Sequence, residues 1–256
     1  MIISMKKHLS VLGLFIRSSL FPVLSMIVLM GAVEVLFFHI ELSRALTAHT
    51  AGIGVGFPSL ERLLDRSAVN VYFALAFVLT TAILCLPGCA FRSKTQYTVA
   101  RLSVTETAVT LWQSVCNILM YLLLASAQTL IAYGLCQYYM AAAPAEFTST
   151  QTVFLAFYRH ELLHALLPLA DAPLWIRNGL LVTALAASAA AFPLKQRAGK
   201  ISVMIVSLAA LAIVFFERGI GEFGQIAIHA CVLLIAICEL LGFMLTRSRE
   251  EADEDE

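Results

Sequence analysis

The sequence predicts an all-α polytopic membrane protein, because it combines an extremely apolar composition with long uninterrupted hydrophobic runs. Hydrophobic residues make up 60% of the 256 residues and charged residues only 13%, and the mean hydropathy is +0.87. Soluble domains carry about 45–50% apolar and about 25% charged residues, and one of this size could not bury so much apolar surface. The runs are continuous rather than alternating, which favours membrane helices over barrel strands.

Six stretches are long enough, or nearly so, to cross a hydrocarbon core of about 30 Å. The fifth is the shortest, but Lys200 and Arg218 flank it and can extend towards the two interfaces. The six stretches form a single membrane domain over residues 1–249, and we expect the acidic tail at 250–256 to be disordered. The expected spans are Ser19–Ile40, Val71–Ala90, Ala108–Cys136, Leu174–Pro193, Ile201–Phe216 and Phe223–Leu245.

Six spans place both termini on the same side of the membrane, and the positive charges select the cytoplasmic side. This arrangement leaves eleven Lys and Arg residues in the cytoplasm and six outside, in agreement with the positive-inside rule. The opening segment Met1–Arg17 is basic and apolar and lacks a small-residue cleavage site. It predicts a helix lying on the cytoplasmic interface, the alternative being a charged flank of the first span.

The loop between the second and third spans contains two capping boxes. The first, Ser93-Lys94-Thr95-Gln96, predicts the start of a short helix that continues through Tyr97–Leu102. The second, Ser103-Val104-Thr105-Glu106, predicts the start of the third span. We therefore expect a rigid helix at the cytoplasmic surface, the alternative being an ordinary connection with good caps.

An amphipathic N-terminal helix, six spans and a short cytoplasmic helix together resemble the permease subunits of ABC-2-type transporters. Residues Lys94–Glu106 resemble the corresponding loop of small bacterial permeases of this kind. The resemblance implies an exporter in the bacterial cytoplasmic membrane, working as a homodimer or heterodimer among membrane lipids. It also implies that the short helix is a coupling helix that docks on a separate ATPase subunit. The docking residues would be Thr95, Gln96, Tyr97, Thr98, Arg101 and Glu106.

This chain departs from the family between spans five and six, where permeases often carry a re-entrant helical hairpin. Only Glu217–Phe223 is available there, which makes the segment between spans three and four the candidate for a structured outer region. The sequence also lacks a Gly-x-x-x-x-Gly-Lys-Ser/Thr motif, so ATP and Mg²⁺ would be bound by the partner. We expect this chain to be non-catalytic, without a cofactor of its own. Nucleic acid is not an expected partner, because 17 basic residues balance 17 acidic ones.

A zinc-protease-like motif lies between spans three and four. On one helix, His160 and His164 would share a face and could hold Zn²⁺, while Glu161 would act as the base. A membrane zinc metallopeptidase is therefore an alternative function, with Asp171 as a third ligand. Against it, Pro168 is expected to end the helix before Asp171, and the short pattern often arises by chance. An interfacial helix with these three residues on its wet side is the simpler interpretation.

Polar side chains also fall within the predicted spans. Carboxylates there are costly, at about 2.5–3.5 kcal/mol for an acid near the centre of a helix, so they should face protein or water. They either form hydrogen bonds between helices or line a substrate pathway.

Besides a transporter and a peptidase, a non-transporting membrane scaffold or immunity protein remains a third class of function. Only a transporter requires the polar residues of the spans to line a pathway. The pathway candidates are Glu34, Asn117, Gln128, His229 and Glu239.

Overall fold

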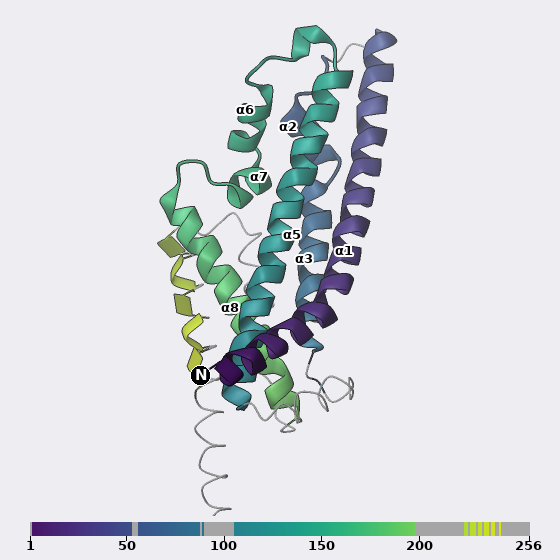
Figure 1. Cartoon of the computed structure of the whole chain (residues 1–256). Coiled ribbons are helices and arrows are strands. Elements are labelled where there is room, and N and C mark those ends of the chain that lie inside the picture. The colour runs from purple at the N-terminus through teal and green to yellow at the C-terminus, as the bar shows by residue number, and fades with distance from the viewer. Residues whose placement is uncertain are drawn as a thin grey trace, which may run out of the picture. The chain divides into compact units, whose positions relative to one another are not determined.

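The chain is helical in all the regular structure that the computed structural model describes (Figure 1). Three helices are long and apolar enough to cross a membrane, and a bent pair of shorter helices makes a fourth candidate. The protein is therefore an all-α membrane protein, as its composition predicts. The described residues are 2–52, 56–87, 89, 105–197, 223–224, 226–228, 230–231, 233–235, 237–238 and 241.

Several predicted elements lie outside the described residues. They are the short cytoplasmic helix, the span over Ile201–Phe216 and the acidic tail. The described residues between 223 and 241, within the predicted sixth span, are helical. The count of six spans therefore stays a prediction.

The first helix, α1, runs from Ile2 to Thr50 without interruption and includes Pro22. The sequence predicts an interfacial helix and a span as two elements, whereas the structure makes both parts of one helix. Its membrane candidate covers 42 residues, about 63 Å at 1.5 Å per residue, which is twice the hydrocarbon thickness. α1 is therefore longer than a single crossing of the hydrocarbon core requires.

Within the described residues the second predicted span, Val71–Ala90, is helical as α3 (Val69–Cys85), and a short helix that the sequence does not predict joins it at a bend. The short helix α2 (Leu60–Arg66) precedes α3 (Val69–Cys85), and their axes differ by 51°. The turn between them depends on Ala68, which has a left-handed φ of 55°. A left-handed conformation at the end of a helix usually belongs to glycine, because a Cβ is strained there.

We expect Ala68→Gly to stabilise the protein by about 1 kcal/mol, since glycine relieves the left-handed strain. The matched control is Gly52→Ala at φ +65°, which should destabilise by a similar amount. Thermal unfolding in detergent measures both. Equal effects of the two variants in the same direction would contradict this account.

The third span, α5, covers Glu106–Ala142, six residues beyond the predicted end. Its N-terminal cap is Thr105, whose Oγ1 accepts a hydrogen bond of 3.4 Å from the Ala108 N–H. The second capping box predicts Ser103 in this role, so the helix begins two residues later than expected. Thr105 takes over because it offers the same hydroxyl acceptor in the same sequence.

The segment between α5 and the next span is structured, as the departure from the permease pattern suggests. A 3-10 turn, η1 (Ala145–Phe147), is followed by α6 (Thr152–Arg159) and α7 (Glu161–Leu166). The next span, α8, covers Ala172–Arg197 and contains the predicted span Leu174–Pro193.

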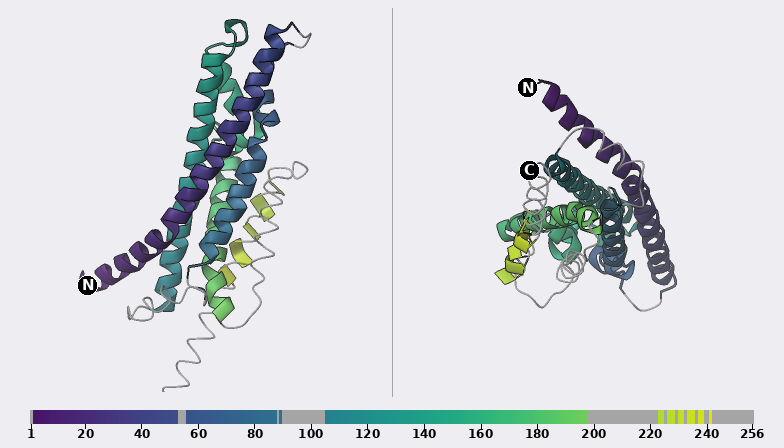
Figure 2. Two further views of the ribbon diagram at one scale, coloured as in Figure 1. Left: turned by 90° about the vertical axis from the view of Figure 1, so that its right-hand side faces the viewer. Right: turned by 90° about the horizontal axis from the view of Figure 1, so that it is seen from below.

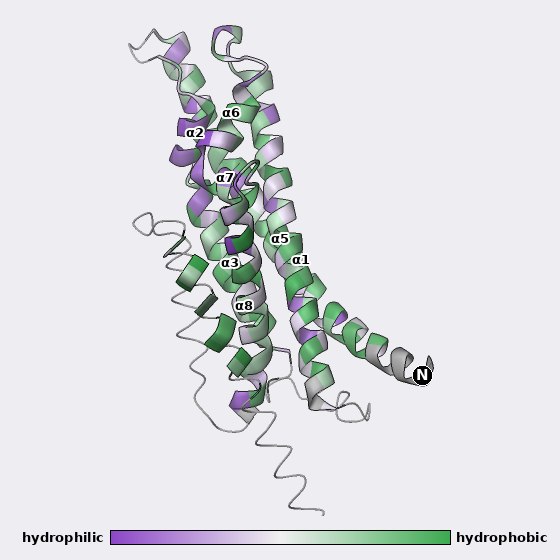
Figure 3. Ribbon diagram, turned by 90° about the vertical axis from the view of Figure 1, so that its left-hand side faces the viewer, coloured by the Kyte–Doolittle hydropathy of each residue, from purple (hydrophilic) through white to green (hydrophobic). Residues whose placement is uncertain are grey.

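The helices contribute to two compact units. The first unit contains residues 1–23, 80–122 and 175–256, and the second contains 24–79 and 123–174. In the second unit α1 and α5 run side by side (Figures 1 and 2), and α2 packs against α6. Two predicted spans lie between α2 and α6 in the sequence. Two crossings return the chain to the same side of the membrane, so the predicted topology agrees with the packing of these two helices. Hydrophilic residues gather on α2 (Figure 3).

Candidate functional site

The most unusual polar contact in the second unit joins α1 to α5. The Gln128 amide Nε2 donates a hydrogen bond of 3.0 Å to Glu34 Oε2. Both side chains are fully buried, at 0% exposure. The contact therefore pairs two of the five residues predicted to line a pathway.

Helical periodicity explains why these two side chains face inward. On α1, Met30, Glu34, Phe38 and Leu42 repeat every four residues, and all four are buried. This spacing forms one stripe along a helix, so the carboxyl occupies a core position between apolar neighbours. On α5, Gln128 lies within a similar buried stripe formed with Leu124, Ala132, Leu135 and Tyr139.

The side chain of Ile131, on α5, packs closely against Gly31 of α1 beside this polar pair. A Cβ added at Gly31, on α1, would lie 3.0 Å from the Cδ1 of Ile131, on α5. Gly31 is three residues before Glu34, and Ile131 three residues after Gln128, so the contact lies within one helical turn of the pair. The small residue lets the helices meet closely, as is common in membrane bundles.

Two oxygens of the pair have no hydrogen-bond partner. They are Glu34 Oε1 and Gln128 Oε1, both fully shielded. An unpaired buried acceptor loses its bonds to water without replacement, at a cost of about 1–3 kcal/mol. The pair is therefore an incompletely satisfied polar site inside the bundle.

Asn117 has a different environment, in the first unit. Its Nδ2 donates to the backbone oxygen of Ala186 on α8 at 3.2 Å, beside the cluster of small side chains that the sequence shows on this helix. Nearby, the Tyr121 hydroxyl donates to Thr81 Oγ1 at 2.8 Å, and Gln113 Nε2 donates to the Pro87 carbonyl at 3.1 Å. These bonds hold helices together. His229 and Glu239 lie outside the described residues.

The zinc-protease-like motif is not carried by one helix. His160 is extended, with φ −77° and ψ 121°, and stands between α6 and α7, which begins at Glu161. As predicted, α7 ends at Leu166, just before Pro168. The two histidines contact different carboxylates: His160 Nε2 lies 3.4 Å from Asp65 Oδ1, and His164 Nε2 lies 2.7 Å from Asp171 Oδ2. Within the described part of the chain, no group of three or more His, Cys, Asp or Glu is placed to hold a metal ion.

His160 instead connects the α6–α7 segment to α2. Its side chain is 1% exposed and faces Asp65 on α2, while the neighbouring Arg159 lies 3.9 Å from Glu61 on the same helix. Burial lowers the pKa of His160 below its ordinary value, although the negative charges of Asp65, Glu161 and Glu61 act in the opposite direction. We infer that the imidazole is buried in its neutral form. The sequence favours an interfacial helix with His160 on its wet side, and for His160 this expectation is wrong, because its side chain is buried.

Because His160 is buried with a lowered pKa, we expect the contact of α6 and α7 with α2 to become less stable at acidic pH. When the contact opens, the His160 imidazole reaches solvent and regains its ordinary pKa of 6.5, whereas the buried imidazole has a lower pKa. Below pH 6.5 the open state therefore binds more protons than the closed state, and a falling pH favours it. Hydrogen exchange of α6 and α7, corrected for its intrinsic pH dependence, should therefore accelerate as pH falls below 6.5. His160→Gln should lose this extra acceleration. A wild type and a variant with equal pH dependence would contradict the prediction.

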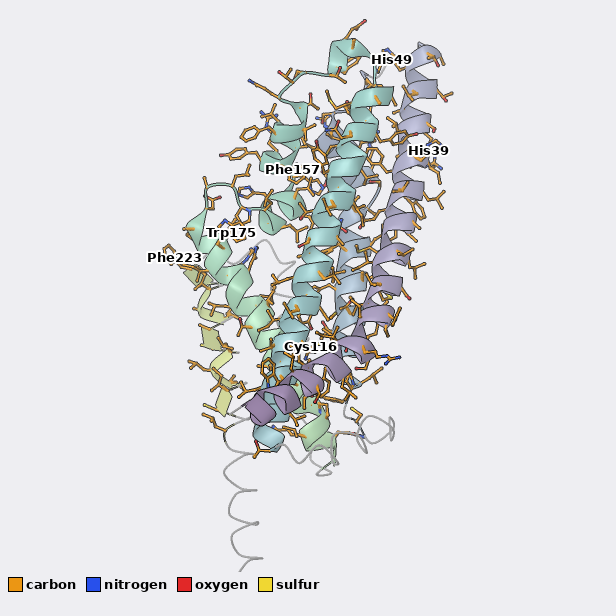
Figure 4. All side chains as sticks on the ribbon, in the orientation of Figure 1. His39, His49, Cys116, Phe157, Trp175 and Phe223 are labelled. Carbon is orange, nitrogen blue, oxygen red and sulfur yellow. The ribbon has the colours of Figure 1, made fainter. Side chains whose placement is uncertain are left out.

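An aromatic cluster closes the end of the second unit. Phe57 contacts His49, Tyr139 and Phe147, with ring centroids 5.5–5.9 Å apart, and Figure 4 labels His49 at the end of α1. The Tyr139 hydroxyl also donates to the Pro58 carbonyl at 3.0 Å. These contacts fix the connections that follow α1 and α5. Aromatic residues in the loops were the available sequence signal for them.

The predicted docking surface is outside the described residues for Thr95, Gln96, Tyr97, Thr98 and Arg101, while Glu106 is the first residue of α5. Comparison with protein-family models, curated proteins and solved structures gave no match. The candidate site therefore rests on the residues themselves.

Proposed function

We propose that this chain is the membrane-spanning subunit of an ATP-driven transporter, an ABC-2-type exporter in a bacterial cytoplasmic membrane. It would work as a dimer with itself or with a second permease. A separate ATPase subunit would bind ATP and Mg²⁺ and drive the alternation of the helices. This chain would carry out no covalent chemistry.

The observation that carries the proposal is the loop of residues 93–106. Two helix-start signals within fourteen residues are more than a passive connection requires, and α5 begins within the second of them, at Glu106. A short rigid helix at the membrane surface is suited to transmit force from a soluble motor. Tyr97 and Arg101 lie four residues apart, so they would share one face of that helix.

The membrane helices add support of a general kind. Long apolar helices provide a bundle, and the buried Glu34–Gln128 pair places polar groups inside it. Intramembrane ionisable residues often belong to substrate or ion pathways. The Asn117 contact with α8 is better explained as a bond between helices. We therefore place the pathway, if it uses any of these residues, at Glu34 and Gln128.

The zinc metallopeptidase is less well supported than the transporter. His160 and His164 lie near separate carboxylates, at 3.4 and 2.7 Å, and the first of them precedes α7. Two histidines that share a helix face are the basis of the zinc-binding pattern. The extended backbone at His160 removes that basis.

The docking surface is tested by a double substitution, Tyr97→Ala with Arg101→Ala. The chain is purified in mild detergent with its partner, and ATP hydrolysis per mole of chain is measured. We expect the recovered activity to fall roughly tenfold or more, which corresponds to about 1.4 kcal/mol of lost docking. The matched control, Tyr158→Ala with Arg159→Ala, removes the same residue types from the exposed surface of α6 and should retain activity. Undiminished activity in the loop variant would overturn the assignment.

A further inference from the structure

The two unpartnered oxygens of the Glu34–Gln128 pair specify what is missing there. When ionised, a carboxylate only accepts hydrogen bonds, and an amide oxygen also only accepts. With Gln128 Nε2 bonded to Glu34 Oε2, the remaining Glu34 Oε1 and Gln128 Oε1 are both acceptors. Two acceptors cannot satisfy each other.

A single proton on Glu34 resolves this conflict. The protonated carboxyl gains an O–H donor, and its closest polar neighbour is the same amide that already donates to it. The acid and the amide can then exchange two hydrogen bonds, one in each direction. Both unpartnered oxygens would be satisfied without any further residue, which matters because both side chains are 0% exposed.

Among the described residues, no positively charged side chain forms an ion pair with Glu34. On its own helix, His39 shares a hydrogen bond of 2.7 Å with Tyr138 of α5, and Glu41 pairs with Arg44. On α3, the Tyr72 ring contacts that of Phe37 in a tilted arrangement.

On α5, Cys136 lies two turns beyond Gln128 and is itself buried. None of the ion pairs of the described residues includes Glu34. An ionised carboxyl would thus be a buried charge with one amide donor, whereas the neutral acid is satisfied by that amide alone.

We propose that Glu34 is a proton-binding site, neutral at physiological pH when α1 and α5 are in contact through Gln128. The bound proton completes the pair and joins the two helices. When they separate, water reaches the carboxyl and the proton is released, so proton release is coupled to opening of the α1–α5 contact. In the closed state both side chains of the pair are fully buried, and Ile131 packs against Gly31 within one helical turn of them. This inference holds whether or not an ATPase drives the protein.

Infrared difference spectroscopy of the full chain in lipid nanodiscs tests the proposal. A neutral carboxyl has a C=O stretch separated from the carboxylate and amide bands. At neutral pH we expect a band of this kind in the wild type that is lost in Glu34→Gln, which preserves the shape and can pair amide to amide. Glu146→Gln, on an exposed loop residue, should leave the band unchanged.

Exchanging the acid and the amide between the two positions tests whether the band belongs to this pair or changes through a general effect of the substitution. In the double variant Glu34→Gln with Gln128→Glu, the same pair is rebuilt in the opposite direction, so the band should return at a shifted frequency. A wild-type spectrum identical to that of Glu34→Gln at neutral pH would show that Glu34 is ionised and would overturn the proposal. A band that is abolished by sodium ions at constant pH would overturn it too, in favour of a cation site.

Discussion

Replacing Gln128 by leucine should destabilise the protein by about 1–3 kcal/mol, because it leaves the fully buried Glu34 without its only hydrogen-bond donor. Hydrogen bonds between membrane helices are worth about 0.6 kcal/mol on average, since the unfolded helices find other partners. Here the effect should exceed that average, because among the described residues Glu34 accepts a side-chain hydrogen bond from Gln128 alone, and its other oxygen has no partner. Unfolding in mixed micelles measures the difference.

The matched experiment removes both polar groups together. Leucine at positions 34 and 128 leaves no stranded acceptor, so the double variant should be more stable than Gln128→Leu alone. A double variant that loses less stability than the sum of the two single variants indicates that the two residues interact directly. A double variant whose loss equals the sum of the two single losses would show that the residues act separately.

A bulky side chain at Gly31 should have the second large effect. Leucine there would drive into Ile131, since even a Cβ would approach its Cδ1 to 3.0 Å. Overpacking of this kind costs about 1–3 kcal/mol. The wedge would also separate α1 from α5 at the turn beside Glu34, so the carboxyl should become hydrated and its neutral-acid infrared band should weaken.

Gly31→Ala provides the control for this wedge. Its single methyl group meets only the flexible end of Ile131, and alanine recovers about 1 kcal/mol of helix propensity. We therefore expect stability within about 1 kcal/mol of the wild type and an unchanged infrared band. If leucine and alanine behave alike, the helices do not meet closely at this position.

Hydrophobic pattern predicted the helices well and their boundaries less well. The third and fourth expected spans lie within α5 and α8, because long apolar runs admit few other structures in lipid. The N-terminal helix and first span are continuous, since α1 accommodates Pro22 within the helix. The bend between α2 and α3 at Ala68 lies before the predicted second span, and alanine carries no sequence signal for a left-handed turn.

For the candidate site, the sequence identifies the polar residues but not which of them contact each other. Glu34 and Gln128 stand out individually as polar residues in apolar runs, but 94 residues separate them, and periodicity alone cannot specify which helices meet. For His160, the expected place on the wet side of a single helix is wrong. His160 has an extended backbone and is buried against α2, and that contact comes from a distant segment.

The transporter proposal is tested most directly by what accompanies the protein. The tagged chain, purified from its native membrane in mild detergent, would be analysed by mass spectrometry for its partners and their stoichiometry. We predict a subunit that carries the Gly-x-x-x-x-Gly-Lys-Ser/Thr motif absent from this chain, in roughly equimolar amount. A chain that purifies without any ATP-binding subunit, while remaining folded and dimeric, would contradict the account.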